Sequence, residues 1–232
     1  MMASLVGNLG QPLLFLLAFG VGLGQKIDTI EGFTYLQFIA PGLTASAVMY
    51  SAAFETTYGS FTRLSTQNTF EGILMTPVTV EEVAIGEIVW GALKGLLSGG
   101  VMIVTMPLFG LWPSPWVVLL LPLLFITGVL FASLGLIMTA TARNYEFFNY
   151  FISLVITPLF LFSGIFFSLS TLSAGSRFFL QVLPLTPMVT LSRMFCYGDF
   201  SGNVWGRILL ITIFAGGATL FGTVLLRRRL IK

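Results

Sequence analysis

The sequence predicts an all-α membrane protein, and three observations carry that prediction. First, the chain of 232 residues holds only 11 Lys and Arg and 9 Asp and Glu. Second, these charges leave five long uncharged runs, and a helix needs roughly 20 apolar residues to cross a hydrocarbon core. Third, the mean hydropathy is +0.96 and 56% of the residues are hydrophobic. The uncharged runs are Met1–Gln25, Gly32–Phe54, Gly95–Ala142, Phe147–Ser176 and Ile208–Leu226.

Hydropathy along these runs predicts six transmembrane helices. The run Gly95–Ala142 is long enough to cross twice, and Trp112–Trp116 (WPSPW) supplies a turn between its halves. The polar loops are too short for a separate soluble domain, so we expect residues 1–232 to form a single membrane domain. The expected spans are Ser4–Gly24, Leu36–Thr57, Ala84–Gly110, Val117–Ala142, Phe147–Leu169 and Val204–Leu226.

Basic residues next to the spans predict the orientation, because cytoplasmic flanks are enriched in Lys and Arg. The tail after the last span carries Arg227, Arg228, Arg229 and Lys232, so we expect a cytoplasmic C-terminus. An even number of spans then places the N-terminus on the same side. The other loops discriminate little, since their basic residues fall on both sides.

The composition excludes several kinds of chemistry. The chain has no histidine and one cysteine, Cys196, which excludes an intrachain disulfide and the usual histidine and thiolate metal sites. No GxxxxGK[ST] phosphate-binding loop occurs, so ATP is not bound in that manner. A net charge of +2 gives no reason to expect nucleic acid. We therefore expect no catalytic residues, no metal and no cofactor in this chain.

The longest loop on the inner side lies between the second and third spans. Within it, Phe70–Thr76 reads as a short amphipathic helix with Phe70, Ile73 and Leu74 on one side, and Pro77 ends it. Thr79–Glu82 (TVEE) has the pattern of a capping box that begins the next helix. Such a surface helix either docks onto a cytosolic partner or rests its apolar face on membrane lipid.

Three ionisable residues belong to the second and third spans. Lys94 lies ten residues beyond the expected start of the third span, near the middle of the bilayer, where a charge is costly and by default suggests function. Glu87 lies two turns earlier, too far for an adjacent-turn pair, so Glu55 on the second span is the expected partner of Lys94. The alternative is that Lys94 snorkels to the interface or pairs for structural reasons alone.

Small residues recur every fourth position on the third span, at Gly91, Gly95 and Gly99. A face of this kind lets the backbones of two helices approach closely. We expect it to serve helix packing.

The segment after the fifth span fits neither a span nor an ordinary loop. Its uncharged stretch Phe178–Ser192 is too short to cross, and Arg177, Pro184, Pro187 and Arg193 interrupt the region. We expect short helices that re-enter the membrane from the outer surface, with a partly buried outer loop as the alternative.

Two blocks of the sequence resemble a known family. FEGILMTPVTVEEVAIGEIVWGALKGLLSG and FLFSGIFFSLSTLSAGSRFFLQVLPLTPMVTLSRMF are similar to the type-2 ABC exporter permeases. The likeness is to the branch that exports nodulation factors, which are lipo-oligosaccharides, with relatives that move drugs or polysaccharides. It runs over nearly the whole chain, although members usually begin with a basic interfacial helix, which we expect either upstream of Met1 or not at all.

The resemblance implies a permease homodimer in a bacterial inner membrane, served by two copies of a separate ATP-binding subunit that holds ATP and Mg²⁺. The inner loop would match the segment that couples the permease to this ATPase, and Phe178–Ser192 the outer re-entrant helices. The implied coupling residues are Phe70, Glu71, Gly72, Ile73, Leu74, Met75, Thr76, Pro77, Glu81 and Glu82.

Other function classes stay open on the residues alone. An ion- or proton-coupled secondary transporter would need an ionisable relay at depth, and Lys94, Glu55 and Glu87 are the candidates. An intramembrane enzyme is disfavoured by the absence of histidine and of paired intramembrane aspartates. A membrane assembly factor would bind partners and transport nothing.

Overall fold

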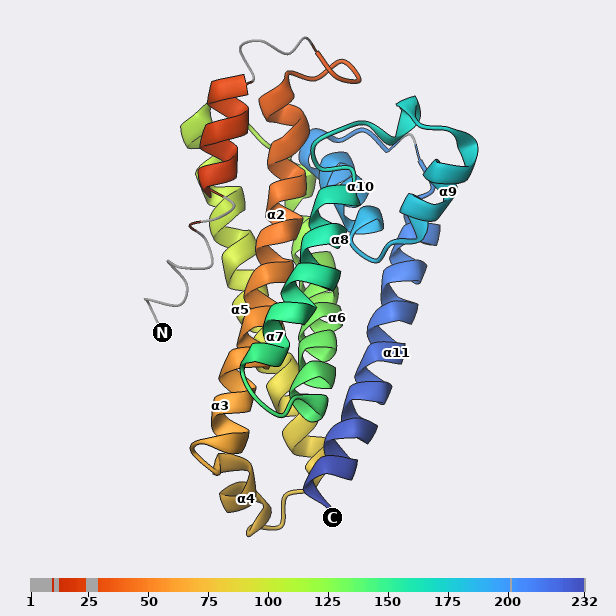
Figure 1. Ribbon diagram of the computed structural model, residues 1–232. Coiled ribbons are helices and arrows are strands. Elements are labelled where there is room, and N and C mark those ends of the chain that lie inside the picture. Colours follow the sequence, from red (N-terminus) through yellow and green to blue (C-terminus); the bar gives the residue numbers. More distant parts are fainter. Residues whose placement is uncertain (1–9, 11–12, 24–28, 201, 232) are drawn as a thin grey trace.

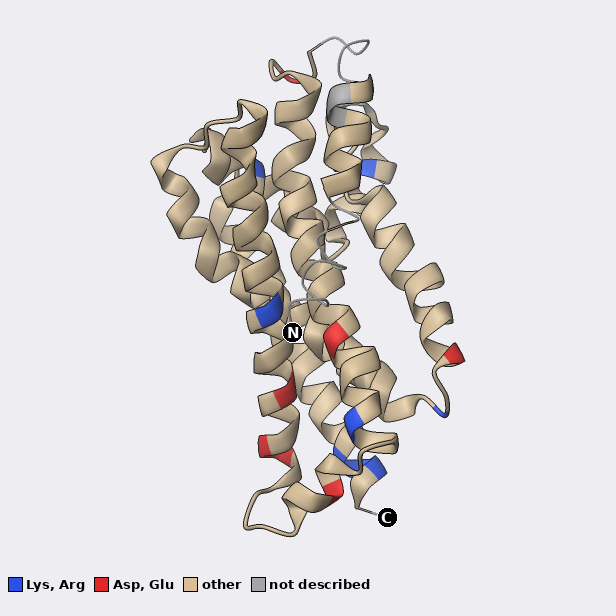
Figure 2. Cartoon of the chain, turned by 90° about the vertical axis from the view of Figure 1, so that its left-hand side faces the viewer, with Lys and Arg blue, Asp and Glu red and all other residues tan. Residues whose placement is uncertain are grey.

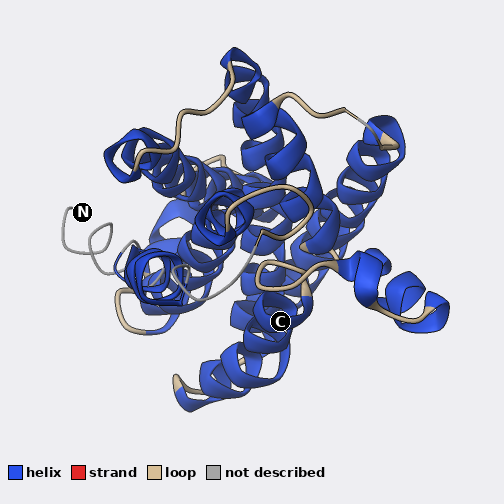
Figure 3. Ribbon diagram, turned by 90° about the horizontal axis from the view of Figure 1, so that it is seen from above, coloured by secondary structure: helices blue, strands red, loops and turns tan. Residues whose placement is uncertain are grey.

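A computed structural model describes residue 10 and residues 13–23, 29–200 and 202–231. The regular elements of this part are helices, and no strand occurs among the described residues (Figure 3). An isolated antiparallel bridge joins Ile30 to Phe33 in the turn before the first long helix. The predicted all-α class is therefore confirmed for the described part of the chain.

The helices form an elongated bundle whose long members run roughly along one axis (Figure 1). Helix α6 packs against α2, α5 and α11 and so occupies the centre of the bundle. Helix α4 and the C-terminus lie at one end, and α9 lies towards the other. The α-helices are α2 (Tyr35–Phe54), α3 (Ser60–Ser65), α4 (Thr69–Leu74), α5 (Val80–Thr105), α6 (Leu120–Thr141), α7 (Glu146–Phe151), α8 (Thr157–Phe162), α9 (Ala174–Val182), α10 (Thr186–Tyr197) and α11 (Val204–Leu230).

Short helical elements of other types extend these helices. The π-helical turns are η1 (Leu16–Leu23), η2 (Glu55–Gly59) and η5 (Ile152–Ile156). The 3₁₀ turns are η3 (Met106–Phe109), η4 (Pro115–Leu119) and η6 (Leu169–Thr171). Because η2 joins α2 directly to α3, and η5 joins α7 to α8, each of these groups is one continuous helix.

Three described helical segments are long and apolar enough to cross a membrane, namely Val80–Phe109, Pro115–Thr141 and Val204–Leu230. The bent pair α9 and α10 would add a fourth, while the run Glu146–Phe162 is apolar but shorter. Residues 4–9, 11–12 and 24 of the expected first span, Ser4–Gly24, lie outside the described residues. Many charged residues gather in the half of the bundle that carries the C-terminus (Figure 2). The count of six spans thus stays a prediction.

Two helices begin with capping boxes whose residue patterns occur in the sequence. At the start of α5, the Thr79 hydroxyl accepts a hydrogen bond from the backbone N–H of Glu82, and the Glu82 carboxylate accepts one from the backbone N–H of Thr79. Thr34 and Gln37 form the same reciprocal pair at the start of α2. These bonds satisfy backbone donors that a helix end leaves without partners. The predicted helix start at Thr79–Glu82 is confirmed.

The fifth helix, which consists of α7, η5 and α8, is shorter than the fifth span that the sequence predicts. We expected a span over Phe147–Leu169, whereas the helical run ends at Phe162. Gly164 has a φ of +77°, a backbone conformation that an α-helix cannot contain. The carbonyl oxygens of Gly164 and Ile165 instead accept hydrogen bonds from the Arg193 guanidinium. A buried arginine donor therefore replaces the helical hydrogen bonds at this point.

The interrupted segment that follows forms two helices, α9 and α10, bent by 88° to each other. Pro184 lies in the break between them and Pro187 lies in the first turn of α10. This geometry is that of a broken span or a re-entrant loop. Helix α10 packs against α2, and nine of its residues are buried. The segment is therefore helical and partly buried, and its re-entry into the membrane stays a prediction.

Small residues let α2, α5 and α6 pack at close range. A Cβ atom at Gly99 would lie 2.7 Å from a Val48 methyl group, and one at Gly91 would lie 2.7 Å from a Thr56 methyl group. On α6, a Cβ atom at Gly128 would lie 2.9 Å from the Cα and the carbonyl oxygen of Ala92. The expected packing role of the glycine face on α5 is confirmed, and α6 contributes a second one.

Replacing Gly128 with alanine should destabilise the bundle, because the new methyl group meets backbone atoms that cannot rotate away. We expect a loss of about 1–3 kcal/mol, as for other overpacked interiors. Gly100→Ala is the matched control, since nothing lies within 4 Å of a Cβ there, and alanine should leave the stability unchanged or raise it slightly. Thermal unfolding of the detergent-purified variants measures both. Equal melting temperatures for the two variants would contradict this packing.

Candidate functional site

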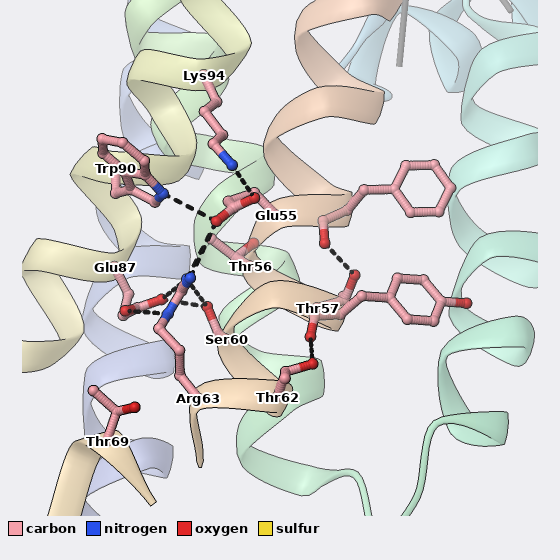
Figure 4. A network of polar contacts seen from close by, with 12 residues as sticks. Glu55, Thr56, Thr57, Ser60, Thr62, Arg63, Thr69, Glu87, Trp90 and Lys94 are labelled. Atoms are coloured by element: carbon pink, nitrogen blue, oxygen red, sulfur yellow. Dashed lines mark hydrogen bonds and ion pairs between the residues drawn. The ribbon is translucent and has the colours of Figure 1, made fainter. Parts of the chain in front are cut away.

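A network of charged side chains links α2, α3 and α5 in the half of the bundle that carries α4 (Figure 4). Glu55 comes from η2, Arg63 from α3, and Glu87 and Lys94 from α5. Two acids and two bases alternate along it, so it is neutral as a whole. We call it the charge chain, and its members in order are Glu87, Arg63, Glu55 and Lys94.

The distances are those of direct, charge-assisted hydrogen bonds. Lys94 Nζ lies 2.6 Å from Glu55 Oε2, so the pairing expected from the sequence is observed. Arg63 Nη1 lies 3.3 Å from Glu55 Oε1. Arg63 also holds Glu87 with two donors, Nε to Oε1 at 2.9 Å and Nη2 to Oε2 at 2.5 Å. Such bidentate pairs are among the stronger polar contacts in proteins.

Two uncharged side chains complete the network. The Trp90 indole donates to Glu55 Oε1 at 2.9 Å, and the Ser60 hydroxyl donates to Glu87 Oε2 at 2.5 Å. Sequence reasoning missed both residues. A usable signal existed for Trp90, because Glu87, Trp90 and Lys94 are spaced three and four apart and thus share one face of α5.

The charge chain is largely shielded from solvent, most strongly where Lys94 meets Glu55. Side-chain exposure is 9% for Lys94 and 11% for Glu55, and rises to 25% for Arg63. Pairs that are shielded in this way are strongly destabilised when one partner is removed, because the other charge is left without a counter-ion. The contacts therefore fix how α3 and α5 lie against each other.

The π-helical turn η2 places the Glu55 carboxylate. A π-turn holds one more residue than an α-turn, and such turns are frequent at functional sites. The glycine at the end of the turn leaves room for the carboxylate, because a Cβ at Gly59 would lie 3.0 Å from Glu55 Oε1. The sequence ETTYG carries no pattern that separates a π-turn from an α-helix, so this feature comes from the structure alone.

Helix α4 projects beyond the charge chain at the end of the bundle (Figure 1). Phe70 is buried (1% exposed), and Leu74 packs against the core. We expected Ile73 on the same side, but it is exposed, as are Glu71 and Met75, the latter at 88%. The helix ends at Leu74, three residues before Pro77. Thus α4 rests on the bundle through Phe70 and Leu74 and presents a mixed polar and apolar surface outward.

The remaining acidic residues of this region have local roles. Glu81 Oε1 lies 3.1 Å from Arg227 Nη1, which links the start of α5 to the end of α11. Both side chains are largely exposed, and exposed pairs contribute little to stability. Glu82 caps α5. Substituting Glu82 therefore perturbs the start of α5 as well as the surface, whereas substituting Glu81 changes mainly the surface.

Arg193 lies at the other end of the bundle, apart from the charge chain. Its guanidinium donates to the carbonyl oxygen of Phe38 at 3.0 Å and of Gly164 at 2.6 Å, and it stacks 3.6 Å from the centre of the Phe38 ring. Tyr197, one turn further along α10, donates to the carbonyl oxygen of Gln37. These contacts tie α10 to α2 and to the end of the fifth helix.

The fold and these contacts are those of an integral membrane protein, with apolar helices, internally paired charges and a surface helix at one end. A profile of the ABC-2 type transporter family matches residues 1–197. The chain belongs to that family, whose members are transport subunits that work with an ATP-binding cassette partner.

Individual relatives support the assignment. Nodulation protein J of Rhizobium meliloti (strain 1021) is 37% identical over 99% of this chain and 87% of its own length. Nodulation protein J of Rhizobium leguminosarum bv. viciae is 36% identical over 100% of this chain and 89% of its own length. The inner membrane transport permease YadH of Escherichia coli (strain K12) is 30% identical over 87% of this chain and 76% of its own length.

A double-mutant cycle tests whether Glu55 and Lys94 depend on each other. Glu55→Gln and Lys94→Met should each destabilise the protein by about 3 kcal/mol, because each leaves a shielded charge without its partner. The double variant should lose less than the sum, with an interaction energy of about 1–3 kcal/mol. Glu146→Gln removes an exposed carboxylate outside the network and serves as control. Additive losses, measured by unfolding in detergent, would show that the two residues act independently.

Proposed function

We propose that this chain is the permease subunit of an ATP-driven exporter in a bacterial inner membrane. The subunit has six spans with both termini in the cytoplasm, works as a homodimer and carries no enzymatic activity. Two copies of a separate ATP-binding subunit hold ATP and Mg²⁺ and supply the energy. The observation that carries the proposal is the position of α4 in a member of the ABC-2 type transporter family. Helix α4 presents exposed side chains and packs against α3 and α5, the two helices that Arg63 and Glu87 join.

The contacts of α4 support its role as the coupling segment. It lies between α3 and α5 along the chain and packs against both. Arg63 on α3 holds Glu87 on α5, and Glu55 on η2 holds Lys94 about two turns further along α5. A force applied to α4 by a partner subunit would therefore reach the second and third spans together.

The cargo that best fits this chain is lipid-like, a glycan or a hydrophobic drug. Two of the relatives described above are nodulation proteins, and a third is an inner membrane transport permease. A cavity of about 830 Å³ between α6, α8, α9 and α11 is lined almost entirely by apolar side chains. Its walls suit hydrocarbon better than an ion or a polar metabolite.

Co-purification with an ATPase tests the proposal. The tagged wild-type chain, extracted from its native membrane in mild detergent, should bring down an ATP-binding protein identified by mass spectrometry and ATP hydrolysis. Glu71→Lys and Met75→Lys should reduce the co-purified ATPase several-fold, because both side chains are exposed on or next to α4 and interface centres tolerate added charge poorly. Glu146→Lys makes the same charge change on α7 and should leave the yield intact.

Two results would contradict this proposal. One is that the wild-type chain brings down no ATP-binding protein, although the wild-type chain and the Glu146→Lys variant are both folded under the same conditions. The other is substrate transport in vesicles that persists when the ATPase is deleted, which would establish an ion- or proton-coupled secondary transporter instead.

A further inference from the structure

A polar pocket of about 450 Å³ lies at the end of the bundle opposite to α4. Its walls come from the turn before α2, from η6, α9 and α10, and from the start of α11. The polar and charged residues that line it are Glu31, Ser170, Gln181, Thr186, Thr190, Arg193, Asn203 and Arg207. The function proposed above uses none of them.

Arg207 is the cation of this pocket that is available to a ligand. Among the described residues, no carboxylate lies within ion-pair distance of it, and its guanidinium contacts Met194 Sδ at 3.8 Å. Arg193 is already engaged with backbone carbonyl groups, and Glu31 accepts hydrogen bonds from Ser168 and Ser170. A half-buried guanidinium without a counter-ion favours the binding of an anion.

A second observation points to a ligand in the same place. Thr186 lines the pocket and is only 2% exposed, yet its hydroxyl has no hydrogen-bond partner. Leaving a buried hydroxyl unpaired is costly, so such groups in proteins usually meet a partner. Helices α10 and α11 both begin at this pocket, and the amino ends of helices carry partial positive charge. An acceptor with negative charge would satisfy all of these groups.

The large apolar cavity follows the polar pocket along the same helix. On α11, Asn203, Arg207 and Leu210 line the polar pocket, and residues of the next turns line the apolar one, beginning at Ile213 and Phe214. Helix α9 contributes to both, with Gln181 on the polar side and Leu180 on the apolar side. A hydrocarbon-like space therefore follows a polar space along α11, and α9 borders each of the two with different residues.

We propose that this end of the bundle binds an acidic amphiphile. Its anionic head group, a phosphate, sulfate or carboxylate, lies at Arg207 and Thr186, and its hydrocarbon chain lies in the apolar cavity. The site is separate from α4 and the charge chain. Its apolar part is the cavity proposed above for the cargo, so the inference deepens that proposal, and lipid binding to the purified chain tests it without an ATPase.

Native mass spectrometry of the purified full-length chain, titrated with phosphatidylglycerol or phosphatidylcholine, tests the site. The wild type should bind the anionic lipid roughly tenfold more tightly, as expected for one charge-assisted contact. Arg207→Gln should remove that preference and Arg207→Lys should retain most of it. Arg143→Gln, which removes an exposed charge from the connection between α6 and α7, should keep the preference unchanged.

A pair of neighbouring glycines tests the hydrocarbon part independently of Arg207. Gly217 lines the apolar cavity and Gly216 does not, and a Cβ at either position meets nothing within 4 Å. Gly217→Leu should fill the cavity and weaken the binding of both lipids several-fold, whereas Gly216→Leu should leave it unchanged.

Three outcomes would overturn the inference. One is equal binding of the two lipids by the wild type, and another is a preference that survives in Arg207→Gln. The third is full competition by inorganic phosphate together with no effect of Gly217→Leu, because the pocket would then take a free anion and no amphiphile. The folded state of each variant is checked by size-exclusion chromatography, and the Gly217 and Gly216 pair keeps the test decisive if Arg207→Gln does not fold.

Discussion

The charge chain fixes the helix arrangement in the half of the bundle that carries α4. Helices α2 and α5 pack through small residues, and such contacts are apolar and short in range. The charge chain also fixes the relative position of the two helices. Lys94 contacts Glu55 only at one axial register and one rotation of each helix about its axis. In a medium of low dielectric, a mismatch would leave a charge without its partner, so the register is set by electrostatics and the distance by glycine.

The opposite half is organised by donors that satisfy irregular backbone. The fifth helix stops at Phe162, and the backbone that follows would expose carbonyl groups where water is scarce. The Arg193 guanidinium bonds to two of those carbonyls and to that of Phe38 on α2. One side chain thus allows a non-helical stretch, the bend between α9 and α10, and the attachment of α10 to the core.

The sequence predicted the features that depend on local patterns or on inventory. The capping box at Thr79, the packing face of α5 and the partner of Lys94 all follow from spacing along helices. The early end of the fifth helix does not follow from local patterns. In the sequence, Gly164 is one residue of an apolar run, and the contact that ends the helix there comes from Arg193, which is distant along the chain. Ile73 faced outward for a related reason: a helix of six residues is oriented by what Phe70 packs against, which periodicity alone does not contain.

The π-helical turn at Glu55–Gly59 has a consequence for how this chain can vary. Deleting one residue there would restore an ordinary α-helix with unchanged hydropathy and uninterrupted hydrogen bonds. It would also turn everything beyond it by about 100°, the rotation per residue of an α-helix. Arg63 would leave Glu87, and α4 would face another way. The number of residues in this helix therefore determines the arrangement of the half that carries α4 as much as the identity of its charged residues does.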